Sequence, residues 1–167
     1  MDERLHIIFA RRSIRAYTGE PVSQEEIESL LQAGMAAPSG SNRKPWHFVA
    51  VTDRATLQAL GERHPYGKMI ANAALGIAVC GDPAASDWWV QDCSAATENI
   101  LVAAAGLGLG GVWLGCHGRP EREQVVRDVL GIPQRIAVLS LLSIGHPAKE
   151  KEARTQYDAR RVHRDAW

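Results

Sequence analysis

Residues 87–107 read DWWVQDCSAATENILVAAAGL, and the rest of the predicted fold is arranged around this segment. It is rich in alanine, leucine and valine and has few helix breakers, so we expect a long helix that is apolar on most of its circumference and therefore buried. The apolar run Leu75–Cys80 precedes it and suits a strand that is covered on both faces. Gly110–Cys116 follows it and is predicted to form another strand.

On either side of these segments, further strands are expected at Trp46–Thr52 and Ile136–Ile144. Helices are expected near Leu5–Phe9, after the capping box Ser23–Glu26, after Asp53, after Pro65, and over Glu121–Leu130. Strands that alternate with helices, after a helical N-terminal third, favour the α+β class. We therefore predict one domain over residues 1–167, with a central mixed β-sheet of four to five strands flanked by helices.

The composition excludes several classes of protein. The chain has 167 residues, 46% of them hydrophobic, so it is neither disordered nor fibrous. Nineteen basic side chains balance nineteen acidic ones, which gives no long-range attraction to nucleic acid or to an anionic membrane. Three cysteines without close spacing favour a reducing compartment, and no leader-like or spanning segment is evident. We expect a cytoplasmic protein.

Two segments resemble nucleotide-binding motifs but lack the structural context or spacing that those motifs require. Residues 106–111 fit the pattern G-x-G-x-x-G, but here a helix precedes the glycines and a strand follows, the reverse of a dinucleotide-binding turn. Residues 61–68 resemble a phosphate-binding loop, yet the glycine spacing is wrong and Met69 stands where Ser or Thr is required. Cys116 and His117 are adjacent, which does not give the usual spacing of metal ligands. No metal site is predicted.

Two other segments have residue types that suit the binding of a small polar ligand. The first is Arg11-Arg12-Ser13-Ile14-Arg15, which suits a phosphate with a polar tail because guanidinium groups bind phosphate bidentately. The second, residues 37–46, is a loop of small hydrogen-bonding residues between prolines, which could wrap a flat polar heterocycle. Alone, each segment has a simpler explanation, a solvated basic turn or an ordinary surface loop.

Together these segments resemble the FMN-dependent nitroreductase family. The resemblance rests on Arg11-Arg12-Ser13-x-Arg15-x-Tyr17 followed by Pro38-Ser39-x-x-Asn42-x-x-Pro45-Trp46, and continues through Gly67-Lys68-Met69, Asn99–Leu107, Gly108–Gly115 and Gly145-His146-Pro147. It covers nearly the whole chain, whose length is similar to the compact branch of the family.

The resemblance implies an intertwined homodimer with two FMN sites at the subunit interface. The C-terminal tail, residues 147–167, lacks a clear period but ends on Trp167, so we expect it to pack on the partner subunit. Arg11 and Ser13 would contact the FMN phosphate and ribityl chain, with Arg12 adding backbone and charge. Arg154 would be a second phosphate-binding arginine.

The resemblance also assigns the ring end of the cofactor. Arg15 and Lys68 would face the pyrimidine end of the isoalloxazine, where cations favour the reduced anion. Leu114 and Gly115 would lie beside flavin N5, and Gly115 replaces an acidic side chain of larger members, which leaves that region smaller and more neutral. The loop residues expected to come from the other subunit are Pro38, Ser39, Gly40 and Asn42.

The implied function is an FMN-dependent oxidoreductase that takes a hydride from NADH or NADPH and passes it, in a ping-pong cycle, to a nitroaromatic, quinone or flavin acceptor. No side-chain nucleophile is required. Three alternatives stay open: a specialised flavoenzyme on the same scaffold (dehalogenase-like, enone-reducing or flavin-fragmenting), a flavin-binding carrier or redox sensor without turnover, and a helix-rich interaction domain without a cofactor.

Overall fold

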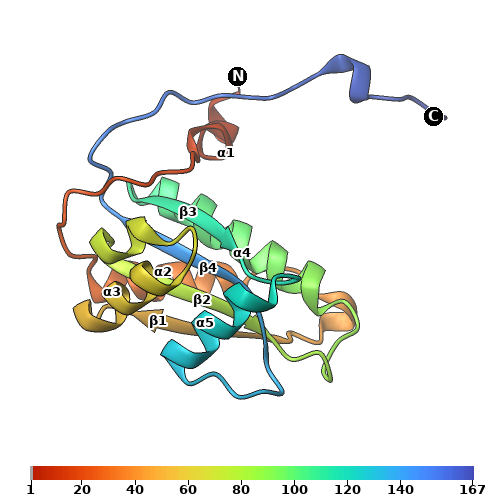
Figure 1. Ribbon diagram of the computed structural model, residues 1–167. Helices are drawn as coiled ribbons and strands as arrows, with labels where there is room; N and C mark the ends of the chain where they lie inside the picture. The colour runs from red at the N-terminus through yellow and green to blue at the C-terminus, as the bar shows by residue number, and fades with distance from the viewer. Residues whose placement is uncertain (1) are drawn as a thin grey trace.

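Four strands form a single antiparallel sheet in the computed structural model, which describes residues 2–167 (Figure 1). The strands are β1 (Trp46–Val51), β2 (Leu75–Gly81), β3 (Gly110–Gly115) and β4 (Ala137–Gly145). Their order is β1-β2-β4-β3, so β1 and β3 are the two edges. We expected a mixed sheet, but every pairing between these strands is antiparallel. Within residues 2–167 the parallel component is limited to an isolated bridge between Ser13 and Gly111.

Residues 2–167 also form five α-helices and four short 3₁₀ turns. The helices are α1 (His6–Ala10), α2 (Gln24–Met35), α3 (Arg54–Arg63), α4 (Trp89–Gly106) and α5 (Pro120–Leu130), and the 3₁₀ turns are η1 (Glu3–Leu5), η2 (Gly40–Asn42), η3 (Lys68–Asn72) and η4 (Ala159–Arg161). The predicted strands and long helices are confirmed within a few residues at their ends. The helix expected from Pro65 is a 3₁₀ turn that begins only at Lys68.

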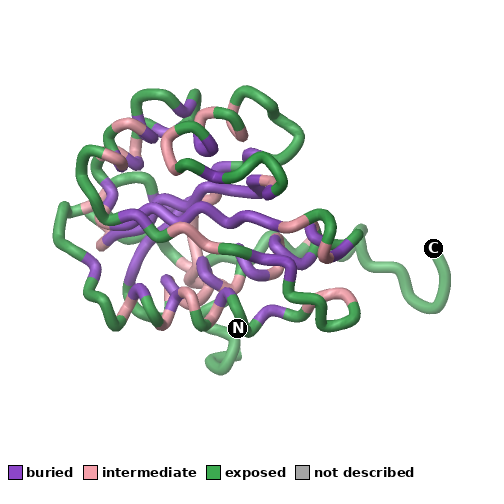
Figure 2. The backbone as a smooth tube through the Cα atoms, turned by 90° about the horizontal axis from the view of Figure 1, so that it is seen from below, coloured by how far each residue is buried: buried purple, intermediate pink, exposed green. Residues whose placement is uncertain are grey.

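The sheet lies between two layers of helices, which Figure 2 shows as a buried centre between two partly exposed layers. Helices α2 and α4 pack on one face, in an apolar cluster that includes Ile77, Ile100 and Leu142. Helices α3 and α5 pack on the other face, in a second cluster that includes Leu57 and Val126. Strand β2 is buried along its whole length because both faces are covered, as its unbroken apolar run predicted.

Local sequence signals fix where the helices begin. The Ser23 hydroxyl accepts the Glu26 backbone N–H, and the Glu26 carboxylate accepts the Ser23 N–H, which completes the predicted capping box of α2. The Asp53 carboxylate accepts the Thr56 N–H at the start of α3. These caps satisfy amide groups that the helix itself leaves without partners.

The C-terminal segment departs from the body of the molecule. After β4 the chain passes α1, where the Arg154 N–H donates to the Phe9 carbonyl at 3.1 Å, and then runs away from the sheet (Figure 1). Trp167 is fully exposed and stacks only on the neighbouring His163 ring, at 4.1 Å between ring centroids. Among residues 2–167, therefore, the end of this segment beyond Arg154 has no core on which to pack.

Candidate active site

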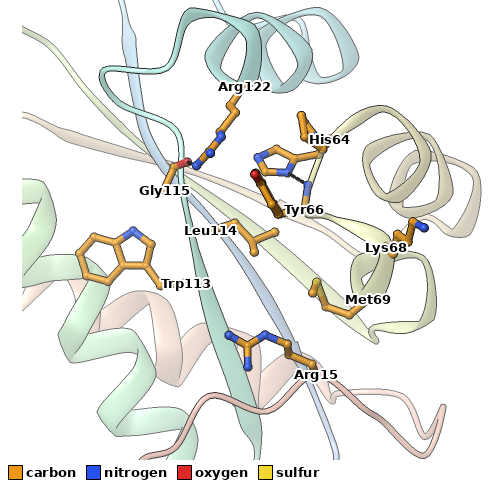
Figure 3. A pocket seen from close by; sticks show the side chains of 10 residues that line it. Arg15, His64, Tyr66, Lys68, Met69, Trp113, Leu114, Gly115 and Arg122 are labelled. Atoms are coloured by element: carbon orange, nitrogen blue, oxygen red, sulfur yellow. Dashed lines mark hydrogen bonds between the residues drawn. The ribbon is translucent and has the colours of Figure 1, made fainter.

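Two cavities follow the free edge of the sheet at β3. The larger, about 550 Å³, lies at the end of the strand and is lined by Arg15, His64, Pro65, Tyr66, Lys68, Met69, Trp113, Leu114, Gly115 and Arg122 (Figure 3). We call it the ring-end cavity. The smaller, about 350 Å³, lies at the start of β3, and we call it the basic cavity. Six of the residues predicted from the sequence line these two cavities.

The basic cavity gathers cations from two ends of the chain. Arg11 and Arg12 come from the N-terminal segment, and Lys149 and Lys151 come from the segment after β4. Glu150 is the carboxylate among the lining residues. The glycine-rich turn between α4 and β3 forms part of the wall, so a ligand can approach the backbone closely there. An excess of positive charge beside accessible backbone suits a phosphate group.

The segment that carries the arginines lies directly along β3. Ser13 forms its parallel bridge with Gly111, and the Ile14 N–H donates to the Gly111 carbonyl at 2.9 Å. A Cβ atom on Gly110 would stand only 2.7 Å from the Ile14 side chain. Gly110 is therefore required for this close approach. Of the three glycines that resemble a dinucleotide motif, Gly106 and Gly111 pack closely against Ile7 and Leu101, whereas Gly108 adopts a positive φ of 75° in the turn between α4 and β3.

Tyr17 anchors the end of the same segment. Its hydroxyl lies 3.0 Å from the Ile14 carbonyl, 2.9 Å from the Ser143 carbonyl and 2.9 Å from the Ser143 hydroxyl. Burial raises the pKa of the Tyr17 phenol to about 12, so it stays protonated and can donate. This anchor holds Arg15, two residues earlier, at the mouth of the ring-end cavity.

Three cations of the basic cavity have partners within the chain. The Arg11 Nε lies 2.9 Å from the Glu98 carboxylate on α4, and Arg12 donates to the Glu152 carbonyl. The Lys151 ammonium donates to the Ser13 carbonyl at 2.8 Å. Both side chains of the Arg11–Glu98 pair are partly exposed, so the pair is weak and a phosphate can compete with it.

The predicted loop residues Pro38, Ser39, Gly40 and Asn42 lie elsewhere. Their loop precedes β1, the edge of the sheet opposite to β3, and none of them lines either cavity. The buried Asp92 carboxylate on α4 holds the loop by accepting the Gly40 N–H at 2.9 Å and the Ser86 hydroxyl at 3.0 Å. Within one chain, the two motifs that carry the resemblance therefore do not meet.

Arg154 and Lys68 are predicted cofactor-binding residues whose side chains are not directed into the cavities. Arg154 lines neither cavity, and its backbone N–H bond to Phe9 is what ties it to the body of the chain. Lys68 lines the ring-end cavity, but its ammonium group points away from Arg15 and from the centre of the cavity in Figure 3.

One corner of the ring-end cavity is formed by residues that the sequence did not predict. Arg122 reaches from α5 toward Gly115 and donates from its guanidinium to the Gly115 carbonyl at 3.1 Å (Figure 3). It also lies over the Tyr66 ring, 4.7 Å from the centroid. Behind Tyr66, the buried His64 ring accepts the Tyr66 N–H at 3.2 Å. No motif marks these residues, because they come from two separate parts of the sequence.

The remaining reactive groups do not suggest other chemistry. Burial raises the pKa of each of the three cysteine thiols to about 12, so none is a thiolate at neutral pH. In the part of the chain that the structure describes, no cluster of three or more His, Cys, Asp or Glu side chains could hold a metal ion. No helix there is both long and apolar enough to cross a membrane.

Fold and site together define an α+β protein with two cation-lined cavities along a glycine-bearing edge strand. The nitroreductase family profile matches residues 8–76 and 63–146. This chain belongs to the nitroreductase family, as its motifs predicted.

Individual relatives agree with this assignment. A protein of Archaeoglobus fulgidus, provisionally named an NADH dehydrogenase/NAD(P)H nitroreductase, is 49% identical over all of both chains. A solved nitroreductase of Desulfovibrio desulfuricans in complex with FMN is 31% identical, with a TM-score of 0.84, and the match covers 100% of this chain and 99% of that one. The NADPH:FMN oxidoreductase of Vibrio harveyi, solved with NAD+, is 28% identical with a TM-score of 0.86 over 99% of this chain and 78% of that one. The enzyme class and cofactors predicted from the sequence agree with these names.

Proposed function

We propose that this chain is an FMN-dependent NAD(P)H oxidoreductase that reduces nitroaromatic, quinone or flavin acceptors by ping-pong hydride transfer. One observation carries the proposal: the arginine segment lies along β3 with a cation-rich cavity at each end. From Gly111 to Gly115 the strand advances roughly 13 Å, at about 3.3 Å per residue, which leaves room for an extended ligand with its phosphate at one end and its ring at the other.

The chain's own residues fit such a ligand. Arg11, Arg12 and Lys149 would hold the phosphate in the basic cavity, with Ser13 beside the ribityl chain. Arg15 would face the pyrimidine end in the ring-end cavity, and Lys68 would do so after a change of side-chain rotamer. Cations fixed there favour negative charge on the ring.

When bound, FMN supplies the centre that accepts and donates the hydride. The protein's part is to bind and orient, because burial keeps its three cysteine thiols protonated at neutral pH. Leu114 and Gly115 form the wall beside the ring, and Gly115 leaves open space, since a Cβ there would have no atom within 4 Å. The nicotinamide donor and the electron acceptor would occupy this space in turn, which is the basis of the ping-pong cycle.

We also propose a homodimer in which Pro38, Ser39, Gly40 and Asn42 of one subunit close the groove of the other. Their position at the sheet edge opposite to β3 supports this, because the groove can receive them only from a second copy. The exposed tail supports it as well: Tyr157 and Trp167 are 73% and 100% exposed, far more than large aromatic side chains usually are. Sedimentation of the full chain tests this proposal, and a monomer at micromolar concentration would contradict it.

The experiment that tests the activity is anaerobic mixing of purified protein with FMN and then with NADH or NADPH. We expect a yellow protein with about one FMN per subunit, rapid bleaching of the flavin by at least one nucleotide, and recovery of the colour when an acceptor is added. Tight FMN binding with very slow bleaching would favour a carrier or sensor. A protein that does not bind FMN would contradict the proposal.

A further inference from the structure

The corner of the ring-end cavity formed by His64, Tyr66 and Arg122 has no part in holding FMN in the proposal above. It lies beside Gly115, where the second substrate is expected. This inference rests on the proposed function, and it concerns which acceptor that function uses.

Arg122 is a cation held in place before any substrate arrives. Its guanidinium donates to the Gly115 carbonyl at 3.1 Å and lies 4.7 Å from the centroid of the Tyr66 ring, so its orientation is fixed by two separate contacts. Its Nε atom is buried and has no hydrogen-bond partner among residues 2–167. Because that Nε is inaccessible, an anionic group in the cavity would bind the terminal guanidinium nitrogens.

Tyr66 supplies a flat surface next to this cation. The side chain is 62% exposed, and its backbone is fixed by the hydrogen bond from the Tyr66 N–H to the His64 Nδ1 at 3.2 Å. Burial and, after it, the positive charge of Arg122 lower the pKa of His64, so its ring is neutral at pH 7 and its Nδ1 can accept. An exposed aromatic ring beside an arginine suits a planar ring that carries a negative charge.

The charges around this corner determine how strongly it attracts an anionic substrate. The Glu121 carboxylate lies 3.8 Å from the Arg122 Nε, but its side chain is 60% exposed, so water screens this pair. Arg15, across the cavity, adds a second positive charge that the same anion would feel. The field in the cavity therefore favours a substrate with a negative group over an uncharged one of the same shape.

We propose that Arg122, supported by Tyr66, binds a carboxylate on the aromatic electron acceptor, and that the enzyme consequently prefers carboxylate-bearing aromatic acceptors to neutral ones. Glu121 competes with that carboxylate for Arg122.

The test compares para-nitrobenzoate with para-nitrobenzamide, which has a similar shape but no charge, as acceptors for the FMN-loaded enzyme with NADPH or NADH. In the wild type we expect a lower KM for the benzoate. Arg122→Gln should raise that KM about tenfold, as expected for a lost charge-assisted hydrogen bond at a partly exposed site. It should leave the benzamide KM within about twofold. Glu121→Gln should lower the benzoate KM by about two- to fivefold, because it removes a screened competing charge.

Arg119→Gln is the matched control, because Arg119 is an exposed arginine near the same helix terminus and its side chain forms no ion pair in the described chain. It should change neither KM. The FMN content, the rate of flavin bleaching by each nucleotide and the thermal unfolding midpoint of every variant are measured alongside.

Several results would overturn the inference. Equal changes in both acceptor KM values would show that Arg122 acts through packing alone. A change confined to the KM for NADPH would assign the corner to a phosphate of the donor. A wild type without preference, with normal FMN content and bleaching, would refute the inference and leave the proposed function intact. A protein without FMN would refute both.

Discussion

Replacing Arg11 by Ala tests whether the basic cavity holds the cofactor phosphate. A charge-assisted hydrogen bond of this kind contributes about 1.5–3 kcal/mol. In the free protein Arg11 pairs with Glu98 at 2.9 Å, and losing a partly exposed pair costs about 0–1 kcal/mol when FMN binds. The difference is about 0.5–3 kcal/mol, so the Kd for FMN should rise about 2- to 150-fold.

Glu98→Gln is expected to change the Kd for FMN in the opposite direction. It removes the competing carboxylate and should lower the Kd for FMN by up to about fivefold, for the same reason. Both values come from titration of FMN into apoprotein, followed by the change in flavin fluorescence. If Arg11→Ala and Glu98→Gln both leave the Kd unchanged, the phosphate lies elsewhere and the assignment of the basic cavity fails.

Three further predictions concern residues that support the groove. Tyr17→Phe should lower the free energy of unfolding in urea by about 1–3 kcal/mol, because it removes the contacts of the Tyr17 hydroxyl with the buried carbonyl and hydroxyl of Ser143; no change would show that water replaces the hydroxyl. Burial lowers the pKa of His64, so the unfolded chain binds more protons below about pH 6.5, and stability present above that pH is lost as the pH falls toward the folded-state pKa. His64→Gln should show a smaller loss between about pH 7.5 and 5.5 in the same urea assay, and equal losses would assign the effect to other groups. Asp92→Ala should lower the thermal unfolding midpoint and loosen FMN, whereas Asp92→Asn, whose amide oxygen can still accept the Gly40 N–H, should do less of both; identical behaviour of the two variants would argue against the hydrogen bond as the cause.

Local chemistry explains why much of the fold could be predicted. The capping box at Ser23 and the Asp53 cap fix helix starts through contacts within four residues, and the apolar run of β2 reports burial on both faces directly. The direction of strand pairing could not be predicted in this way, because it depends on how the connections between strands cross the sheet. The parallel component is reduced to the single bridge at Ser13, which no local pattern specifies.

The family and the candidate residues for the cofactor could be predicted from the amino-acid sequence, because the arginine segment and the proline-bounded loop carry their residue types at fixed spacings. Which of these residues lie close together depends on how the chain folds. Arg11 and Arg15 face two cavities because Gly110 lets their segment lie against β3, whereas the loop at Gly40 lies at the opposite edge. Arg122 lines the ring-end cavity although no sequence motif includes it. It reaches the cavity from α5, which lies outside the segments that carry the predicted residues, so no fixed spacing marks it.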